Sequence, residues 1–304
     1  MSILVIGSFV TDLIARTKRA PEAGETVVGT SFHTSYGGKG ANQAVAAKKM
    51  GQEVIMAGSV GNDSYGDSFI KLFEELGFDS KYIYKSKKAT GCSVVVIDEA
   101  AQNRIVMTPG ANLDFPKERL LALEEIIKKV DIVVCQFEMA DEIVPTIAML
   151  TKKHHKRFIL NPAPAKAISD KVLASLSVIT PNETELGIIV GKKLETINDY
   201  IAASESLLAK GVENVVVTLG VVGSLLVNKD GAYLQKAFKV KAIDTVGAGD
   251  SFTGSLAALL DEGYQIKDAL RIASAVAALE VTREGAIKAM PTREEVFSFL
   301  VEQE

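Results

Sequence analysis

Short apolar runs recur along the chain and alternate with segments whose apolar residues have a helical period. The runs cover residues 3–6, 54–57, 132–135, 158–160, 178–179, 215–219 and 225–227. Because they contain almost no polar positions, both faces of each strand are expected to be buried. Such strands are typical of a parallel sheet covered by helices on both sides.

Helical spacing marks the segments between these runs. Apolar residues recur three and four positions apart at 69–76 before Gly77, at 120–127 after Pro116, at 143–150 after Asp141 and at 252–260 before Gly263. A glycine directly after such a pattern favours a helix C-terminus. Strands that alternate with amphipathic helices predict an α/β fold, in which three α/β/α layers surround a mostly parallel sheet. We expect a single domain of this kind over residues 1–304.

Two stretches, 13–36 and 90–108, break the alternation because they lack a helical period. They contain strand-like runs at 26–28, 93–97 and 104–107, with turn residues between them. We interpret them as a small separate sheet inserted into the main domain, placed as a lid. The last four residues of the run at 93–97 are all apolar, so both faces of this strand need to be buried. This pattern favours a homodimer formed through the lid over packing of the lid on its own domain.

The composition narrows the class of protein. The chain has 304 residues, of which 47% are hydrophobic, and a formal net charge of −4 with both signs interspersed. It has no basic patch of the kind that binds nucleic acid or an anionic membrane surface. No apolar stretch reaches the roughly 18 residues of a membrane span, and the first residues do not resemble a signal peptide. Two cysteines in apolar runs fit buried free thiols, so we expect a cytoplasmic protein without nucleic-acid or membrane partners.

Residues 244–250, with the sequence DTVGAGD, form the most informative segment. They follow a strand-like run at 238–243 and open the helix predicted over 252–260. Small residues at a helix start leave backbone N–H groups open, and these groups bind anions together with the helix dipole. Asp250 in this first turn allows two interpretations. It is either a carboxylate that complements the helix start or a general base beside an anion-binding pocket.

A second glycine-rich segment, 36–43 with the sequence YGGKGANQ, precedes an alanine-rich helix that ends near Gly51. It lacks the spacing of a Walker P-loop. Its glycines allow the backbone to approach a ligand closely, and Lys39 and Asn42 can bond hydroxyl or phosphate groups. The alternative is a tight turn with a solvent-exposed lysine.

Polar residues follow the predicted strands. Asp12, after the first strand, can accept two hydroxyls of a sugar diol, or it is an ordinary turn aspartate. Other polar residues follow the strands at 132–135, 158–160, 178–179 and 215–219. Because ligands of such sheets bind beyond the carboxyl ends of the strands, these residues are expected to converge on one rim.

Two further segments have both structural and functional interpretations. Asn182 and Glu185 begin a helix after Pro181, where they complement the helix dipole or, alternatively, bind nucleotide phosphates and order a water on Mg²⁺. Residues 218–223, TLGVVG, form a turn where the backbone approaches a phosphate or an adenine, or a plain hairpin.

Together these segments resemble the ribokinase-type family of carbohydrate and nucleoside kinases from end to end. The motifs GGKGANQ at 37–43 and DTVGAGD at 244–250 carry the resemblance, and GET at 24–26, NPAPA at 161–165 and PNETE at 181–185 support it. The runs at 37–43 and 161–165 are most similar to those of the family's ribose-phosphorylating members. The resemblance implies a ribokinase-like domain with a β-sheet lid.

The resemblance also implies a role for each matching residue. Asp250 is expected to take the proton from the sugar's 5-hydroxyl while Gly247, Ala248 and Gly249 hold the transferred phosphoryl group. The sugar is expected to contact Asp12, Gly38, Lys39, Gly40, Asn42, Glu138 and Asp250. ATP is expected to contact Asn182, Thr218, Gly220, Gly223, Gly249 and Ser274, and Glu185 is expected to organise Mg²⁺.

Members of the family bind a monovalent cation, usually K⁺, beside the anion-binding turn. Its expected ligands are the Asp244 carboxylate and the backbone carbonyls of Val246, Glu280, Arg283 and Gly285. A serine is common where this chain has Ala289. Unless water replaces the missing hydroxyl, the site is one ligand short.

The substrate is less tightly specified than the reaction. Some bacterial relatives have asparagine at the position of Val10, which cannot bond a hydroxyl. An apolar wall discriminates weakly between a sugar and its deoxy analogue. We expect D-ribose, whose diol suits Asp12, with 2-deoxy-D-ribose as the alternative.

Three other functions receive less support. A nucleoside kinase would need a wider and more apolar pocket, and the motif at 37–43 disfavours it. A dinucleotide-binding oxidoreductase would need GxGxxG after the first strand, where Phe9-Val10-Thr11-Asp12 stands instead. A non-catalytic sugar-binding protein would be free to lose Asp250 and its glycines, which are present.

Overall fold

The structure is a computed structural model that describes residues 2–100 and 102–303. Its main sheet has nine strands in the described residues. Their spatial order is β13 (Gly231–Lys236), β12 (Gly223–Asn228), β11 (Asn214–Thr218), β10 (Val178–Ile179), β9 (Arg157–Leu160), β8 (Ile132–Cys135), β1 (Ile3–Ile6), β4 (Val54–Gly61) and β5 (Ile83–Ser86). From β11 to β5 every pairing is parallel, whereas β11, β12 and β13 form antiparallel hairpins. The prediction of a mostly parallel sheet is confirmed, and every predicted core strand lies in it.

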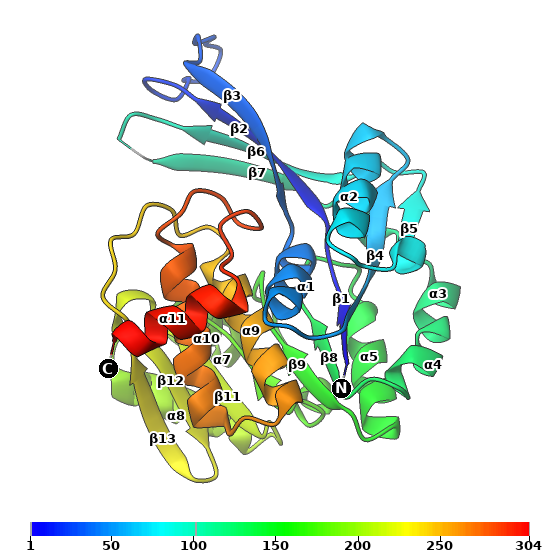
Figure 1. Ribbon diagram of the computed structural model, residues 1–304, viewed down its shortest axis with the longest axis vertical. Helices are drawn as coiled ribbons and strands as arrows, with labels where there is room; N and C mark the ends of the chain where they lie inside the picture. The colour runs from blue at the N-terminus through cyan, green and yellow to red at the C-terminus, as the bar shows by residue number, and fades with distance from the viewer. Residues whose placement is uncertain (1, 101, 304) are drawn as a thin grey trace.

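Helices cover both faces of this sheet, which confirms the three-layer arrangement (Figure 1). Side chains alternate along β1, so that Ile3 and Val5 enter one apolar cluster and Leu4 and Ile6 enter the other. The first cluster is covered by α1 (Lys39–Lys49), α2 (Ser64–Glu75), α9 (Ala248–Glu262), α10 (Ile266–Glu280) and α11 (Arg293–Glu302). The second is covered by α3 (Lys117–Ala122), α4 (Glu124–Ile127), α5 (Ile143–Lys153), α6 (Asp170–Leu173), α7 (Glu183–Val190) and α8 (Ile197–Leu208).

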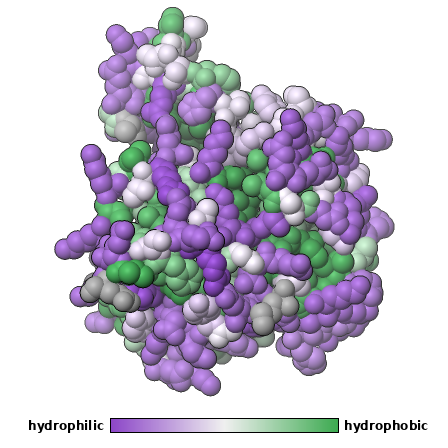
Figure 2. Space-filling view, in the orientation of Figure 1, coloured by the Kyte–Doolittle hydropathy of each residue, from purple (hydrophilic) through white to green (hydrophobic). Residues whose placement is uncertain are grey.

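A second sheet of four strands forms the predicted lid. Its order is β3 (Ser31–Gly37), β2 (Val10–Arg16), β6 (Gly91–Ile97) and β7 (Asn103–Thr108), with β2 and β6 parallel and the outer pairs antiparallel. It projects beyond the three layers in Figure 1 and stands out as a lobe in Figure 2. Because β2 follows β1 closely and β3 leads into α1, both strands connect the lid to the rim of the main sheet.

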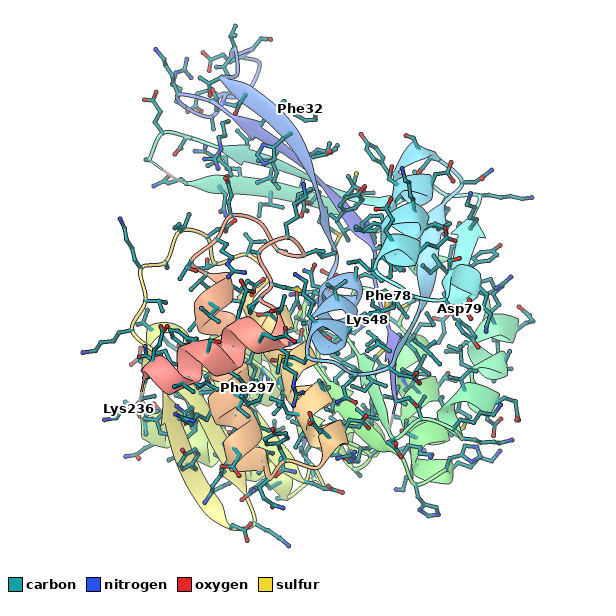
Figure 3. All side chains as sticks on the ribbon, viewed as in Figure 1. Phe32, Lys48, Phe78, Asp79, Lys236 and Phe297 are labelled. Carbon is teal, nitrogen blue, oxygen red and sulfur yellow. The ribbon has the colours of Figure 1, made fainter. Side chains whose placement is uncertain are left out.

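Aromatic packing holds the connection between β1 and β2. Phe9 is fully buried, with its ring centroid 5.2 Å from that of Phe69 and 5.1 Å from that of Phe73. On the next layer of the same cluster, the ammonium of Lys48 lies 4.9 Å from the centroid of the Phe78 ring (Figure 3). This packing fixes the backbone from which the rim residues project.

Some local predictions were wrong. The run at 238–243 is not a strand. The backbone N–H of Ile243, its last residue, donates to the carbonyl of Val281, which follows α10, and not to a strand. The run at 26–28 is also irregular, because β2 ends at Arg16 and offers it no partner. The helix predicted over 120–127 is divided at Leu123 into α3 and α4. Cys135 is buried as expected, but Cys92 is only half-buried.

In the described residues, no helix has the length and apolar character that crossing a membrane requires.

Candidate active site

The first turns of α1 and α9 meet at the rim of the main sheet. Their close approach depends on Gly254, where a Cβ would lie only 2.3 Å from the backbone carbonyl oxygen of Gln43. Any larger residue at this position would push the two helices apart. The contact brings Asp250, one turn earlier on α9, against the side chains of Asn42 and Gln43.

Both carboxylate oxygens of Asp250 accept amide hydrogen bonds. Asn42 Nδ2 donates to Oδ2 at 2.9 Å, and Gln43 Nε2 donates to Oδ1 at 2.9 Å. Asp250 is only 6% exposed, so these bonds are shielded from water. A carboxylate that merely complements a helix start faces solvent, and the enclosed geometry therefore favours the interpretation as a base.

Three more polar residues lie behind Gln43. Its Oε1 accepts from Gln136 Nε2 at 2.6 Å, and its Nε2 also donates to Asn161 Oδ1 at 3.2 Å. Asn161 Nδ2 in turn donates to the carbonyl of Thr180 at 2.9 Å. Because Gln136, Asn161 and Thr180 follow β8, β9 and β10, the predicted convergence of polar residues on one rim is confirmed. The sequence assigned no role to Gln43 itself, although it closes the motif at 37–43.

The turn before α9 leaves backbone donors open. Gly247 is its N-cap at φ +91°, and its carbonyl accepts the N–H of Asp250 at 2.8 Å. The N–H of Ala248 makes only a long bond of 3.4 Å to Thr245. In the part of the chain that the structure describes, the N–H groups of Gly247 and Gly249 find no acceptor. A Cβ on Gly249 would meet no atom within 4 Å, so the turn is open on the side to which this Cβ would point.

Glu280 lies buried beneath this turn and is 1% exposed. One of its carboxylate oxygens accepts from the Ser251 hydroxyl, while Oε1 has no hydrogen-bond partner among the described residues. A Cβ on Gly247 would lie 2.6 Å from this oxygen, so position 247 requires glycine for space as well as for its positive φ. Burial raises the pKa of Glu280 to about 8.

Asp12 lies where the lid meets the rim. On β2, it accepts a hydrogen bond from the Ser93 hydroxyl of β6. Its Oδ2 packs against Gly37, where a Cβ would come within 2.6 Å. Burial raises the pKa of Asp12.

Glu138 joins the start of α1 to the end of β8. It accepts from the backbone N–H of Lys39 at 3.0 Å and from the Ser8 hydroxyl. Gly40 approaches Gly7 so closely that a Cβ would lie 2.5 Å from the Gly7 Cα, and Gly38 is the N-cap at φ +93°. The glycines thus bring the α1 start onto the carboxyl end of β1.

The Lys39 ammonium interacts electrostatically with three carboxylates of the rim. The negative charge of Asp250 raises the pKa of the Lys39 ammonium, with smaller contributions from Glu138 and Glu185. Burial raises the pKa of both Glu138 and Glu185. The Lys39 ammonium therefore lies near three carboxylates and offsets part of their negative charge.

The two segments with double interpretations lie side by side. Asn182 is the N-cap of α7 and forms a capping box with Glu185, with hydrogen bonds of 2.8 and 2.9 Å. A β-bridge joins Asn182 to Thr218. Gly220 and Gly223, at φ +51° and +125°, form the turn of the β11–β12 hairpin. Asn182 and Glu185 thus cap a helix, and residues 218–223 form a hairpin turn, as their structural interpretations predict. The bridge between Asn182 and Thr218 also brings the two segments together.

The candidate cation ligands surround the loop before α9. Asp244 Oδ1 accepts from the N–H of Val246 at 3.1 Å, and Oδ2 accepts from the N–H of Gly285 at 3.0 Å. Glu280 lies close enough for its pKa to feel the charge of Asp244. The Arg283 side chain turns away to Glu295, with one hydrogen bond of 2.7 Å.

Ser274 stands apart from the other candidates. It is buried within α10, and no hydrogen bond between described residues links it to the rim. The remaining candidates fall into three groups: the sugar side at Asp12, Gly38, Lys39, Gly40, Asn42 and Glu138, the anion turn at 244–250 with Glu280, Arg283 and Gly285, and the α7–hairpin group.

Comparison with known proteins agrees with this arrangement. The model of the pfkB family of carbohydrate kinases matches residues 1–293. A ribokinase from Haemophilus influenzae is 35% identical over 300 residues, covering 98% of both chains, and a deoxyribokinase from Salmonella typhi is 36% identical over 302 residues, covering 99% of both.

A solved structure extends the likeness to three dimensions. The ribokinase from Arabidopsis thaliana, complexed with ribose and ATP, superposes with a TM-score of 0.91 at 32% identity, over 98% of both chains. Since the likeness covers both the three layers and the lid, it also supports the sequence resemblance as a whole. The chain belongs to the pfkB family of carbohydrate kinases, within its ribokinase-like branch, and is a phosphotransferase that acts on a sugar hydroxyl.

Proposed function

We propose that the protein transfers the γ-phosphoryl group of ATP to the 5-hydroxyl of D-ribose, with Asp250 as the general base. The observation that carries the proposal is the position of the Asp250 carboxylate, in the first turn of α9 beside the unpaired N–H groups of Gly247 and Gly249. A base and an anion-binding turn on the same helix start can hold an attacking hydroxyl and a phosphoryl group in line.

The reaction follows from this geometry. Asp250 takes the proton of the 5-hydroxyl, whose oxygen attacks the γ-phosphorus as the bond to the β-phosphate oxygen breaks and ADP leaves. The negative charge on the phosphoryl oxygens is met by the donors of Gly247, Ala248 and Gly249, and by the Lys39 ammonium. Since phosphoryl transfer depends mainly on position and charge, fixed donors are an effective catalyst.

The sugar site is proposed to lie between the lid and α1. Asp12 keeps lone pairs free beside its bond from Ser93, which suits a diol, and Glu138, Lys39 and Asn42 stand on the opposite side. The nearby Val10 is 4% exposed and has no hydrogen-bonding side chain. Relatives of 35 and 36% identity are named for ribose and for deoxyribose kinases respectively, so 2-deoxy-D-ribose is the second candidate substrate.

ATP is proposed to lie along Asn182, Thr218, Gly220 and Gly223, toward Ser274 on α10. The ribose- and ATP-bound relative of the same fold supports this proposal. Glu185 fits a role toward Mg²⁺, because only one of its carboxylate oxygens serves the capping box. When bound, Mg²⁺ neutralises charge on the nucleotide phosphates.

A monovalent cation such as K⁺ is proposed beside the anion turn. The oxygen-rich set fits a hard cation: the Asp244 carboxylate with the carbonyls of Val246, Glu280, Arg283 and Gly285. The buried Oε1 of Glu280, which has no hydrogen-bond partner among the described residues, adds a further oxygen in the same region. Ala289 contributes no side-chain oxygen. When bound, the cation supplies positive charge behind the anion-binding turn.

The lid is proposed to form a homodimer interface. Leu13, Val94 and Val106 are paired across three neighbouring lid strands, so their side chains lie on the same face of the lid. Phe32 is paired with Ala15, two residues after Leu13, and therefore lies on that face too. Val94, Val106 and Phe32 are 46, 69 and 65% exposed, and Phe32 is visible on the projecting sheet in Figure 3. Asp12 and Ser93 lie on the opposite face, so a second lid can cover the apolar face without blocking the sugar site.

Replacement of the base tests the proposed chemistry. Asp250→Asn keeps the shape of the side chain but cannot accept the proton. We expect kcat to fall by on the order of a thousandfold, about 4 kcal/mol of transition-state stabilisation, with the sugar still bound. Steady-state kinetics and calorimetric sugar binding measure the two effects. Near-normal turnover of this variant would show that another group is the base.

The open space at Gly249 tests the phosphate position. Gly249→Ala meets no protein atom and replaces a helical glycine, so the melting temperature is expected to stay equal or rise. Its methyl group is expected to obstruct the phosphoryl group and lower kcat/KM for ATP at least tenfold, roughly 1.4 kcal/mol. The matched control, Gly254→Ala, meets Gln43 and is expected to lower the melting temperature. Unchanged ATP kinetics in Gly249→Ala would place the phosphate elsewhere.

Substrate choice is tested by comparing D-ribose with 2-deoxy-D-ribose at saturating MgATP, with and without K⁺. If the site pairs the 2-hydroxyl, kcat/KM for ribose is expected to exceed that for deoxyribose by well over tenfold, which is more than about 1.4 kcal/mol. A ratio near or below one would identify 2-deoxyribose as the better substrate.

The lid interface is tested by light scattering at micromolar concentration. The wild type is expected to have the mass of a dimer, and Val106→Lys that of a monomer, because a charge in the apolar face opposes burial. Val28→Lys is the control, since Val28 is 89% exposed but lies outside the lid strands. A monomeric wild type would exclude the interface.

A further inference from the structure

We propose that Gln43 is a positioning residue for phosphoryl transfer, which holds one oxygen of the Asp250 carboxylate in place and keeps it a hydrogen-bond acceptor. The inference rests on the proposed role of Asp250 as the base. It goes beyond that role because it assigns the orientation of the base to a chain of buried amides anchored on the main sheet.

Gln43 has no contact with solvent. Its side chain is completely buried, and its Nε2 lies 2.9 Å from Asp250 Oδ1. A long polar side chain is costly to bury unless its hydrogen-bonding groups are all used. In Gln43 they are used: Nε2 also donates to Asn161 at 3.2 Å, and Oε1 accepts from Gln136 at 2.6 Å.

The direction of this chain of bonds is set by its chemistry. A carboxamide turned by 180° would place its oxygen against the carboxylate of Asp250 and its NH₂ group against the NH₂ group of Gln136. Both contacts would be repulsive, so Gln43 has one favourable orientation. The Oε1 of Gln136 has no hydrogen-bond partner among the described residues, so packing alone confines this end of Gln136: a Cβ on Gly7 would lie only 2.2 Å from that oxygen.

The anchoring points lie on neighbouring strands. Gln136 directly follows β8, and Asn161 directly follows β9 and is tied to the Thr180 carbonyl after β10. The Asp250 carboxylate is therefore held in position by the centre of the sheet, through Gln43, as well as by its own helix. A residue held only by α9 would shift with any movement of that helix start.

The two oxygens of Asp250 are held differently. Asn42, which holds Oδ2, has a buried Oδ1 without a partner in the described residues, so nothing fixes its amide from behind. Gln43 is held at both ends. We therefore assign the fixed side of the carboxylate to Gln43 and the side that adjusts to the sugar to Asn42.

If Gln43 loses its amide, the carboxylate gains freedom to rotate. Misplacement of a reacting group by about 1 Å can cost on the order of a hundredfold in rate. Substrate affinities are expected to change little, because Gln43 is sealed from the substrate side.

The test compares wild type, Gln43→Met, Gln136→Met and Asp250→Asn as full-length enzymes. Methionine fills nearly the same volume as glutamine without its amide. In Gln43→Met we expect kcat to fall ~10- to 100-fold while KM for ribose and ATP stays within about threefold. Gln136→Met, which only removes the donor behind Gln43, is expected to lower kcat by less, again without a matching change in KM.

The outcomes separate positioning from simple structural support. A melting-temperature scan and titration of active sites correct each kcat for the folded fraction. If the corrected kcat of Gln43→Met matches the wild type, or if its KM for ribose or ATP rises in proportion as kcat falls, the inference is wrong. If that variant does not fold, an unchanged corrected kcat in folded Gln136→Met overturns it. Normal turnover in Asp250→Asn would instead overturn the proposed base, whatever the glutamine variants show.

Discussion

The contact between the first turns of α1 and α9 is the constraint on which the rest of the site depends. It brings Asn42 and Gln43 onto the two oxygens of Asp250. The approach is possible because Gly254 lets the backbone of α1 close to within contact of α9. Asp250, the turn before α9 and the glycine-rich start of α1 are therefore held together as one unit.

The parallel sheet provides the frame for this unit. The carboxyl ends of β1, β8, β9 and β10 lie on one edge, so short polar segments after each strand reach the same place. Glu138 holds the start of α1 from β8, and Gln136 and Asn161 hold Gln43. The lid completes the arrangement because β2 carries Asp12 from the rim into the second sheet.

Much of the fold could be predicted from apolar periodicity. Runs such as Ile3–Ile6 and Ile132–Cys135 have no polar position and form buried parallel strands, and the C-cap of α9, Gly263, was also foreseen. The failures lie elsewhere: 238–243 has a strand-like composition but pairs with no strand of the described residues, and the helix expected over 120–127 is divided at Leu123 although Leu123 fits its apolar spacing. Strand propensity depends on such partners more than helix propensity does.

The site shows the same division. Local patterns identified Asp250 and the glycines, because helix starts with small residues have recognisable chemistry. Nothing local distinguished Gln43 from its neighbours, since its role comes from Gln136 and Asn161, each about a hundred residues away. Glu280 was assigned only through its backbone, whereas its side chain proves to be the buried carboxylate under the turn.

The most direct measurement is identification of the reaction product by phosphorus and carbon NMR after incubation with MgATP and D-ribose. A base at Asp250 beside the donors of Gly247 and Gly249 leads to a single product with phosphate on the 5-oxygen and one ADP formed for each sugar consumed. Phosphate on a different oxygen, or ADP formed without any phosphorylated pentose from ribose or 2-deoxyribose, would contradict this placement of the base and the phosphoryl group.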